Sequence, residues 1–508
     1  MTAQDEGTAP ALQGVQLVIA IIVIAAANFM SFLDMTIANV ALPHIAGALG
    51  VTPDEGVWAI TSYAVAEAIS VPLTGWVSAR FGTTRVFVVS SMIFGVFSLV
   101  CGLSTSLGIL VVARIAQGLA GGFLIPTTQI LLQAVVPPKK ANIAIAVWGM
   151  TALVAPIFGP VLGGYFCDSL SWSWCFFVNI PVAILCVLVP PLLLPKDKPA
   201  DTGLGVDGVG LGLLILWVGA LQIALDTGER QDWFESSSIA ILVITAGVGL
   251  TAFVIWELTD AAPIVDLKVF RHRAFAVATV VMFIAYGSMT SFNVVFVLWL
   301  ENAKGYPAIW AGWVMAFMAI SGTFATPVIS YLMSRVDPRL LISGGLMVVA
   351  ASFMSRVGYI SSIPFDGLIL GQVMIGTGGT LFFLPIMGIA TASVNKDEIA
   401  SAAGLFNFAR TMSLAFGSAT GIAVWGGMTK VNHAELVGAL NTDAVTRVTS
   451  QDLSLQQAAI IDSLVQNESV LLAVGNYCLL LGIACGAAAL LIWLVPRPDG
   501  PLEALPAH

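Results

Sequence analysis

The residues Leu33-Asp34-Met35-Thr36-Ile37-Ala38-Asn39-Val40-Ala41-Leu42-Pro43 place a carboxylate within the first long apolar stretch of the chain. If this stretch crosses a bilayer, an ionised Asp at mid-helix costs about 2.5 to 3.5 kcal/mol, so such a residue normally has a partner or carries a proton. Asp34 is therefore the first candidate for a functional residue. The alternative is that Asp34 lies at the wetted outer end of its helix and has no role.

The composition identifies a membrane protein that crosses the bilayer many times. The 508 residues are 58% hydrophobic and only 10% charged, with a mean hydropathy of +0.95, whereas soluble domains have about 25% charged residues. Lys and Arg are scarce, so nucleic acid is not expected as a ligand. Because the chain has no His-Glu-x-x-His, Gly-x-Ser-x-Gly or phosphate-binding loop, we expect neither an enzyme nor a metal ion or organic cofactor.

Fourteen apolar stretches are long enough to cross a hydrocarbon core of roughly 30 Å, which takes about 20 helical residues. They cover residues 17–39, 57–76, 84–105, 107–130, 142–166, 175–194, 205–226, 238–258, 273–300, 308–333, 339–358, 366–392, 401–427 and 470–495. The predicted fold is therefore an all-α integral membrane protein with 14 transmembrane helices.

The basic residues orient the chain, because Lys and Arg remain in cytoplasmic loops. One side carries thirteen of them, and the other carries only Arg230, Lys304, Lys430 and Arg447. Both termini are therefore predicted to be cytoplasmic. Residues 1–16 lack the basic segment of a cleavable signal peptide, so we expect the first helix to be retained.

Proline and arginine spacings repeat within the chain at an offset of about 255 residues. Pro72 lies eight residues before Arg80, and Pro327 lies eight residues before Arg335. Such repeats are typical of transporters built from two helical bundles. The repeat pairs the last six helices with the first six and leaves the seventh and eighth as an insertion, in a 6+2+6 arrangement.

The predicted organisation has five parts. They are a cytoplasmic N-terminal tail (1–16), an N-terminal six-helix bundle (17–194), a linker with the two inserted helices (195–272), a C-terminal six-helix bundle (273–495) with an external loop at 428–469, and a cytoplasmic C-terminal tail (496–508). Asp207 is expected to cap the first inserted helix. A helical stripe in the external loop, Leu455, Ala458, Ile461 and Val465, either docks a partner protein or packs on its own bundle.

Arg114 is predicted to lie at a depth similar to that of Asp34, about seven residues or roughly 10 Å below the outer end of its helix. A guanidinium beside a carboxylate favours the charged acid, and separating the two lets the acid take up a proton. The pair is therefore a candidate for proton coupling. The alternative is a fixed ion pair that only orders the bundle.

Further polar residues within the predicted spans are candidates for a substrate cavity: Glu67, Asn39, Gln117, Gln372 and Arg410. Glu67 either shares the proton, attracts a cationic substrate, or is a neutral acid hydrogen-bonded within the bundle. Arg410 either closes an internal gate or binds an anionic group. Arg356 is expected to extend its side chain to the membrane surface and has no assigned role.

The fifth span has one smooth face of small residues at positions 155, 159 and 163. Such a face lets a neighbouring backbone approach closely, and prolines bend the helix. Gly159, Pro160, Gly163 and Gly164 are therefore candidates for packing and gating, although the pattern fits a static seam equally well. At the end of this span, Cys167 and Cys175 flank a short loop and either form a disulfide or remain free thiols.

These motifs together resemble the major facilitator superfamily, and more narrowly the fourteen-helix drug:proton antiporters of the EmrB/QacA type, over nearly the whole chain. The stretch from Leu33 to Pro43 is similar to the family's first-helix acidic motif, and Arg114-Ile115-Ala116-Gln117-Gly118 to its fourth-helix motif. The glycines and proline at 159–164 resemble the antiporter motif of the fifth helix. Trp172-Ser173-Trp174-Cys175-Phe176-Phe177-Val178-Asn179-Ile180-Pro181 fits the motif that opens the sixth.

One motif departs from the superfamily pattern. Gly75-Trp76-Val77-Ser78-Ala79-Arg80-Phe81-Gly82 matches the loop between the second and third helices, with Arg80 as a gating residue, but Ala79 stands where an Asp is usual. A gate that uses that Asp is therefore not expected to operate in the usual way. The stretch Leu221–Asp226 with Asp232-Trp233 resembles the EmrB branch more than the QacA branch.

The resemblance implies a proton-driven multidrug exporter of hydrophobic or amphipathic toxic compounds in the bacterial inner membrane, which works by alternating access. The proton gradient would be its energy source. It also implies a tripartite pump with a periplasmic adaptor of the EmrA type and an outer-membrane channel of the TolC type. The alternatives are a dedicated metabolite transporter of the same fold and, from a different class, a membrane scaffold for a secretion assembly.

Overall fold

The computed structural model describes residues 14–137, 141–194, 207–260, 263–360, 363–395, 398–439 and 455–496. Over these ranges the secondary structure is helical, and eleven of the described helices are long and apolar enough to cross a membrane. The remaining three predicted spans are helical too, at residues 58–81, 141–169 and 399–439. The predicted all-α fold is confirmed, and each of the fourteen predicted spans coincides with helix.

The first six spans are formed by helices in the N-terminal part of the chain. They are α1 (Gly14–Leu49), α3 (Trp58–Ser70) with η1 (Val71–Leu73) and α4 (Thr74–Phe81), α5 (Thr83–Gly102), α6 (Leu107–Val135), α7 (Ala141–Ser169), and α8 (Trp174–Phe177) with α9 (Asn179–Leu188) and α10 (Pro190–Leu193). A short α2 (Pro53–Gly56) precedes α3. The second span is divided at Pro72 because proline cannot donate to the helical ladder.

The remaining eight spans follow in the same manner. They are α11 (Gly208–Thr227), α12 (Ser237–Thr259), α13 (Arg273–Asn302), α14 (Ala308–Met333), α15 (Pro338–Ser355), α16 (Phe365–Ala392), α17 (Ile399–Ala439), and α19 (Leu455–Leu491) with η7 (Ile492–Leu494). Short turns η3 (Glu229–Gln231), η4 (Trp233–Glu235) and η5 (Leu267–Arg271) connect them. The predicted cap of α11 is confirmed, because Asp207 Oδ1 accepts hydrogen bonds from the backbone of Val209 and Gly210 at 3.1 and 2.8 Å.

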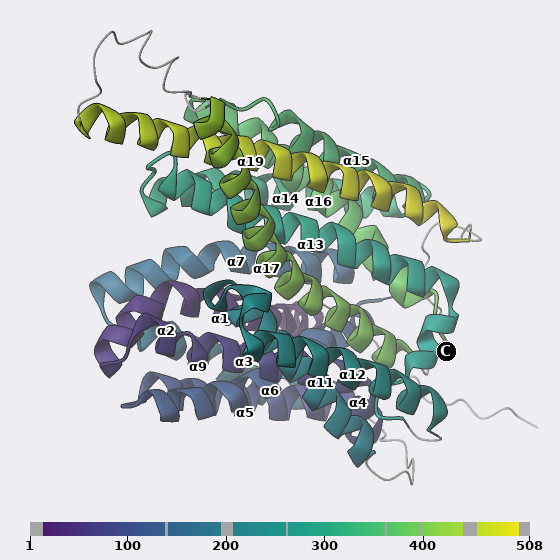
Figure 1. Ribbon diagram of the computed structural model, residues 1–508. Coiled ribbons are helices and arrows are strands. Elements are labelled where there is room, and N and C mark those ends of the chain that lie inside the picture. Colours follow the sequence, from purple (N-terminus) through teal and green to yellow (C-terminus); the bar gives the residue numbers. More distant parts are fainter. Residues whose placement is uncertain are drawn as a thin grey trace, which may run out of the picture.

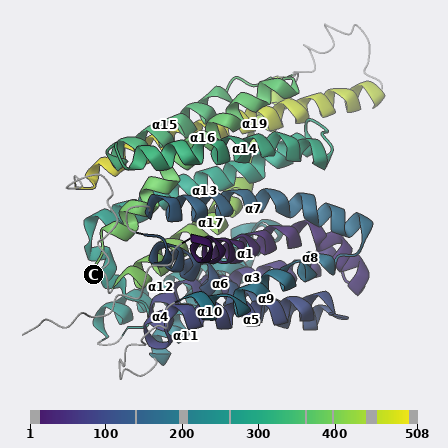
Figure 2. The ribbon, with the colours of Figure 1, turned by 180° about the vertical axis from the view of Figure 1, so that it is seen from behind.

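Helix neighbours in the first half recur in the second half. The pairs α1–α7, α3–α6, α5–α6 and α5–α9 correspond to α13–α17, α14–α16, α15–α16 and α15–α19. In Figures 1 and 2 these helices form two layers, with α7 and α17 between them. The layers meet where α7 packs on α14 and α16, and where α17 packs on η1, α4 and α6. The inserted α11 packs on α3 and α12, which places the insertion at the side of this arrangement.

The predicted external loop at 428–469 is largely helical where the structure describes it. Helix α17 continues to Ala439, and α19 already begins at Leu455 (Figure 1). The two extensions are joined by Asn432, which donates to the Ser469 carbonyl at 3.4 Å, and Val465 is buried between them. The side chains of Leu455 and Ala458, two members of the predicted stripe, lie outside the described residues.

Candidate functional site

An ion pair lies between α1 and α6. Arg114 Nη1 is 2.5 Å from Asp34 Oδ2, and the two side chains are 1% and 0% exposed. The structure therefore brings together the two residues that the sequence placed at similar depth. Asp34 is buried and does not lie at a wetted helix end.

Two amide side chains complete the surroundings of the Asp34 carboxylate. Gln117 Nε2 donates to Asp34 Oδ1 at 3.0 Å, and Asn179 Nδ2 donates to the same oxygen at 2.8 Å. Gln117 follows Arg114 by three residues, so both side chains leave the same face of α6. With the guanidinium on Oδ2, the carboxylate accepts three hydrogen bonds, which stabilise its ionised form.

The Arg114 guanidinium is held by the backbone and by aromatic rings. Its Nε donates to the Ala59 carbonyl at 2.9 Å, and its central carbon lies 4.1 Å from the centre of the Tyr63 ring. This contact requires α6 to approach α3 closely at Gly118, where a Cβ atom would collide with the Tyr63 carbonyl oxygen. The Phe176 ring of α8 lies 5.5 Å from the same guanidinium carbon.

A second polar cluster lies deeper in the molecule, where the two layers meet. Glu67 of α3 and Arg410 of α17 are both fully buried. Both carboxylate oxygens of Glu67, and Nη1 and Nη2 of Arg410, have no hydrogen-bond partner in this structure. Arg410, Asp34 and Arg114 all act electrostatically on Glu67. Because unsatisfied polar groups are costly inside a membrane, these two residues are candidates for a functional site.

Aromatic rings surround Arg410. Its guanidinium carbon lies 4.6 Å from the centre of the Phe32 ring, 5.8 Å from Tyr286 and 6.0 Å from Trp148. Trp148 of α7 in turn stacks on Phe383 of α16, with 6.2 Å between ring centres and 9° between planes. Charged atoms without partners inside an aromatic enclosure are suited to bind an amphipathic molecule.

One hydrogen bond in this central region joins helices of the two halves directly. Asn407 Nδ2 of α17 donates to Gln129 Oε1 of α6 at 2.7 Å. Asn407 Oδ1 also accepts from Arg410 Nε at 3.4 Å. Arg410 is therefore oriented by Asn407, which lies one turn earlier on α17. Asn407 is itself hydrogen-bonded to Gln129 of the opposite half.

Three of the predicted cavity and gating residues lie elsewhere. Gln372 of α16 is buried against α14, where Nε2 contacts the Met315 sulfur at 3.7 Å. Asn39 is exposed on α1. Arg80 lies at the end of α4, with its guanidinium carbon 5.6 Å from the centre of the Trp76 ring. None of the three contributes to the central cluster described above.

The glycine face of α7 packs on α1 just beyond Asp34. A Cβ atom on Gly159 would collide with the side chain of Thr36, and one on Gly163 would lie 3.2 Å from the Ile37 carbonyl oxygen. A Cβ on Gly164 would meet nothing within 4 Å. The side chain of Pro160 lies outside the described residues. The seam therefore involves Gly159 and Gly163, and its partner is the helix that carries the acid.

The expectation for Arg356 is wrong. Its side chain is only 1% exposed and points into the helices, with the guanidinium carbon 4.6 Å from the centre of the Phe292 ring. Nη1 donates to the Ser352 carbonyl at 2.7 Å, which ties the side chain back to its own helix. The expectation used only the position of Arg356 near the end of its helix. The direction of the side chain also depends on the face of the helix, and Arg356 lies at the end of α15 on the side that faces α16 and α13.

Several residues of the site were not identified as candidates from the sequence. Asn179, Tyr63, Gln129, Asn407 and Trp148 all contribute contacts described above. Asn407 could have been found from its spacing, since it lies one turn from Arg410 within an apolar span. Trp148 and Tyr63 carried no such signal, because aromatic residues are common throughout the spans.

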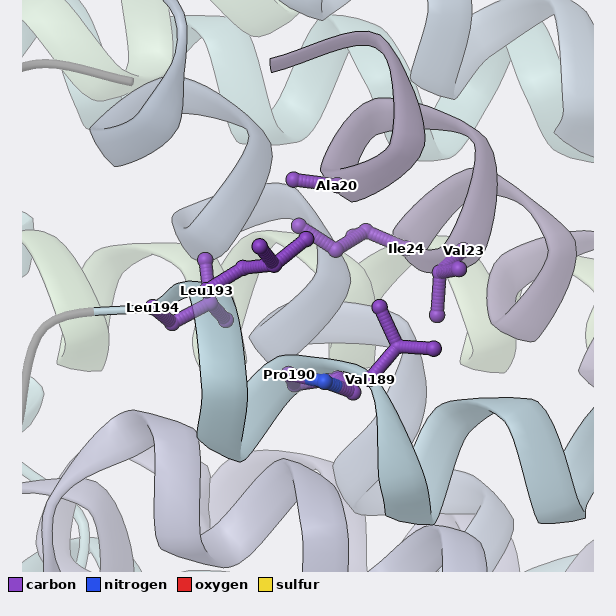
Figure 3. A pocket seen from close by; sticks show the side chains of 7 residues that line it. All are labelled: Ala20, Val23, Ile24, Val189, Pro190, Leu193 and Leu194. Atoms are coloured by element: carbon purple, nitrogen blue, oxygen red, sulfur yellow. The ribbon is translucent and has the colours of Figure 1, made fainter. Parts of the chain in front are cut away.

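A hollow between α1 and α9–α10 is unrelated to this site. Figure 3 shows that only apolar side chains line it: Ala20, Val23, Ile24, Val189, Pro190, Leu193 and Leu194. It offers no polar side chain that would orient a charged substrate.

Bilayer-length helices with an ion pair and unpartnered charges buried among them define a membrane transporter. The chain belongs to the Major Facilitator Superfamily, whose family model matches residues 24–418. The protein is thus a multi-pass membrane transporter and not an enzyme.

The relatives and solved structures support this assignment. The chain is 39% identical to the multidrug export protein EmrB of Haemophilus influenzae over 85% of each chain, and 37% identical to the probable multidrug resistance protein EmrY of Escherichia coli over 94% of this chain and 95% of that one. It is 38% identical to the fatty acid resistance protein FarB of Neisseria gonorrhoeae over 84% of each. The human organic anion transporter MFSD10 has the same fold, with a TM-score of 0.59 at 13% identity, covering 93% of this chain and all of that one.

Proposed function

We propose that the protein is a proton-coupled multidrug efflux transporter, which exports hydrophobic or amphipathic toxic compounds by alternating access. Its similarity to proteins named EmrB and EmrY supports drug export. The observation that carries proton coupling is the Asp34–Arg114 pair, because an ionised acid is held there by three donors inside the membrane. No metal ion or organic cofactor takes part in the proposed cycle, which draws on the proton gradient.

In the proposed cycle Asp34 exchanges its salt bridge for a proton. A proton on Oδ2 removes the negative charge that holds Arg114 Nη1. The guanidinium then keeps its hydrogen bonds to Ala59 and Gln117 and its contacts with the Tyr63 and Phe176 rings. The protonated acid no longer attracts α6 toward α1. The glycine face of α7 packs against the same part of α1, so loss of the Asp34–Arg114 ion pair changes the packing of α7 on α1. Helix α7 also contacts the opposite layer.

We assign the substrate to the region around Glu67 and Arg410. Its charged atoms lack hydrogen-bond partners in this structure, and the aromatic rings beside Arg410 come from both halves, so a molecule bound there would interact with both. Gln129 and Asn407 supply further polar contacts at the same level. Glu67 would attract cationic groups and Arg410 anionic ones, which fits a transporter for chemically varied amphiphiles.

The test is Asp34→Asn in purified protein reconstituted into sealed vesicles with an imposed pH gradient. We expect gradient-driven efflux of a fluorescent dye to be lost, because the amide cannot carry the proton. Asp207→Asn, which alters the cap of α11 and its contact with Trp256 but not the Asp34–Arg114 pair, is the matched control and is expected to retain efflux. Normal efflux by Asp34→Asn would remove Asp34 from the mechanism, and competition among unrelated dyes distinguishes multidrug export from transport of a single metabolite.

We also propose that the protein lies in a bacterial inner membrane with both termini cytoplasmic, as the inner subunit of a tripartite pump. In that orientation the paired extensions of α17 and α19 face the periplasm, where Val431 and Leu464 are 57% and 58% exposed. Exposed apolar side chains on such a projection are suited to bind a periplasmic adaptor of the EmrA type. The adaptor would in turn connect to an outer-membrane channel of the TolC type.

The double variant Val431→Asp with Leu464→Asp tests the adaptor contact. We expect vesicle efflux to be unchanged, while the adaptor no longer co-purifies with the transporter and cells lose drug resistance. If the adaptor still co-purifies, the contact lies elsewhere on the protein.

A further inference from the structure

We infer that Cys167 and Cys175 form a disulfide that links the end of α7 to α8, and that in the orientation proposed above this disulfide lies on the outer face of the membrane. Their sulfur atoms are 3.9 Å apart, although both residues are thiols in this structure. A disulfide needs the sulfurs at about 2.05 Å, so the two side chains must rotate toward each other before the bond forms. The transport mechanism uses neither residue.

The two thiols differ in exposure. Cys167 is partly exposed and accessible to an external disulfide, whereas Cys175 is fully buried beside it. The Cys167 thiolate attacks a dithiol-oxidising protein or a small organic disulfide, and one thiolate leaves. The deprotonated Cys175 sulfur then attacks Cys167 within the mixed disulfide and expels the second thiolate. Two protein thiols are thereby oxidised and the external disulfide is reduced to two thiols.

The connection would join two walls of the proton site. Cys167 lies one turn beyond Gly163, which packs on α1 after Asp34. Cys175 precedes Phe176, whose ring contacts the Arg114 guanidinium, and α8 also packs on α1 and α7. Because the linked elements already contact one another, the bond would restrain the turn between them without tying one layer of helices to the other.

The experiment uses intact cells and the full-length protein. Cells are first treated with a membrane-impermeant maleimide, then with a reductant, and then with a second, mass-distinct maleimide, before peptide mass spectrometry. We expect Cys167 and Cys175 to acquire only the second label, while the unreduced protein yields a linked peptide lighter by two hydrogen atoms. In the denatured, unreduced protein, four of the six cysteines should react.

Variants separate a disulfide from simple burial. Cys167→Ser should leave Cys175 reactive after denaturation without reductant, and Cys175→Ser should do the same for Cys167. The control Cys485→Ser, a buried cysteine of α19, should retain the linked peptide. Oxidised wild-type protein should denature at a higher temperature than reduced protein and export dye at an unchanged rate. Modification of Cys167 by the first label would overturn the inference. So would free thiols at both Cys167 and Cys175 in the denatured and unreduced protein.

Discussion

Two buried acids of the first layer have opposite surroundings. Asp34 accepts hydrogen bonds from Arg114, Gln117 and Asn179, whereas Glu67 has no partner for either oxygen in this structure. A carboxylate with a full set of donors is stabilised as an ion, and one without donors is stabilised as a neutral acid or by a ligand. This contrast supports the proposal that Asp34 carries the proton and that Glu67 contacts the substrate.

Asn179→Ala is expected to weaken gradient-driven efflux, because it removes one of the three hydrogen bonds that orient the Asp34 carboxylate. A hydrogen bond to a charged group contributes about 1.5 to 3 kcal/mol, so the variant should also be less stable by about that amount. Dye efflux from vesicles and thermal denaturation measure the two effects.

Ser91→Ala is the control for that variant, since the Ser91 hydroxyl donates only to its own helix at the Phe87 carbonyl. Its efflux rate should equal that of the wild type. An unchanged efflux rate of Asn179→Ala would show that this hydrogen bond does not contribute to transport.

The two buried arginines Arg114 and Arg356 are expected to respond differently to replacement by Met. Arg114→Met leaves the Asp34 carboxylate buried without its counter-charge and should cost about 3 to 5 kcal/mol. Arg356 has Nε and Nη2 unpartnered, so Arg356→Met removes a poorly satisfied buried charge and should cost less than about 1 kcal/mol. Thermal denaturation in detergent compares them, and equal losses would contradict the difference in pairing.

At the scale of elements, α7 has contacts that no other helix combines among those described here. Its glycine face lies on α1 beside the acid, and other faces pack on α14 and α16 of the opposite layer. Its Trp148 reaches Arg410 and Phe383. A change at Asp34 can therefore be transmitted through α7 to the other layer by direct contact.

Gly159→Ala is expected to reduce efflux and lower stability, because its Cβ would collide with Thr36 on α1. Overpacking of this kind costs about 1 to 3 kcal/mol. Gly164→Ala is the matched control, since its Cβ meets nothing within 4 Å, and it should behave as the wild type. Dye efflux and thermal denaturation are measured together. Equal behaviour of the two variants would show that the seam tolerates separation of the helices.

At the scale of the whole molecule, two layers of helices enclose charges that neither layer satisfies. Arg410 belongs to α17 but rests on Phe32 and Trp148 of the first half, and Asn407 binds Gln129 across the same boundary. Alternating access requires these contacts to separate and form again as one half moves against the other.

A disulfide between α7 and α16 should therefore stop transport. A Cβ on Gly149 would lie 2.5 Å from a terminal methyl of Leu384, so side chains at these two positions meet across the boundary between the layers. We expect Gly149→Cys with Leu384→Cys, in a background with Cys167→Ser and Cys175→Ser, to lose efflux on oxidation and to regain it on reduction. The single Gly149→Cys variant is the control, and efflux by the oxidised double variant would show that this boundary does not open.

Much of the architecture was predictable from hydropathy, since backbone groups inside a bilayer must be satisfied within helices. Helix is present at each of the fourteen predicted spans, and the cap at Asp207 is confirmed. The offset between Pro72 and Pro327 has a counterpart in the repeated helix neighbours. The five-part division of the chain, with its external segment at 428–469, remains a prediction.

The sequence by itself determined the helices, the two-fold repeat and the presence of acids and arginines within apolar spans, because these depend on local composition and period. Only the tertiary structure decided which of those charges meet. Arg114 pairs with Asp34, which is eighty residues away in the sequence. Arg410 and Glu67 have side-chain atoms without hydrogen-bond partners, and the Arg356 side chain is buried. The physical reason is that the pairing of charges depends on how the helices rotate and cross. These angles are set by packing between segments that are distant in the sequence, and a local sequence pattern does not determine them.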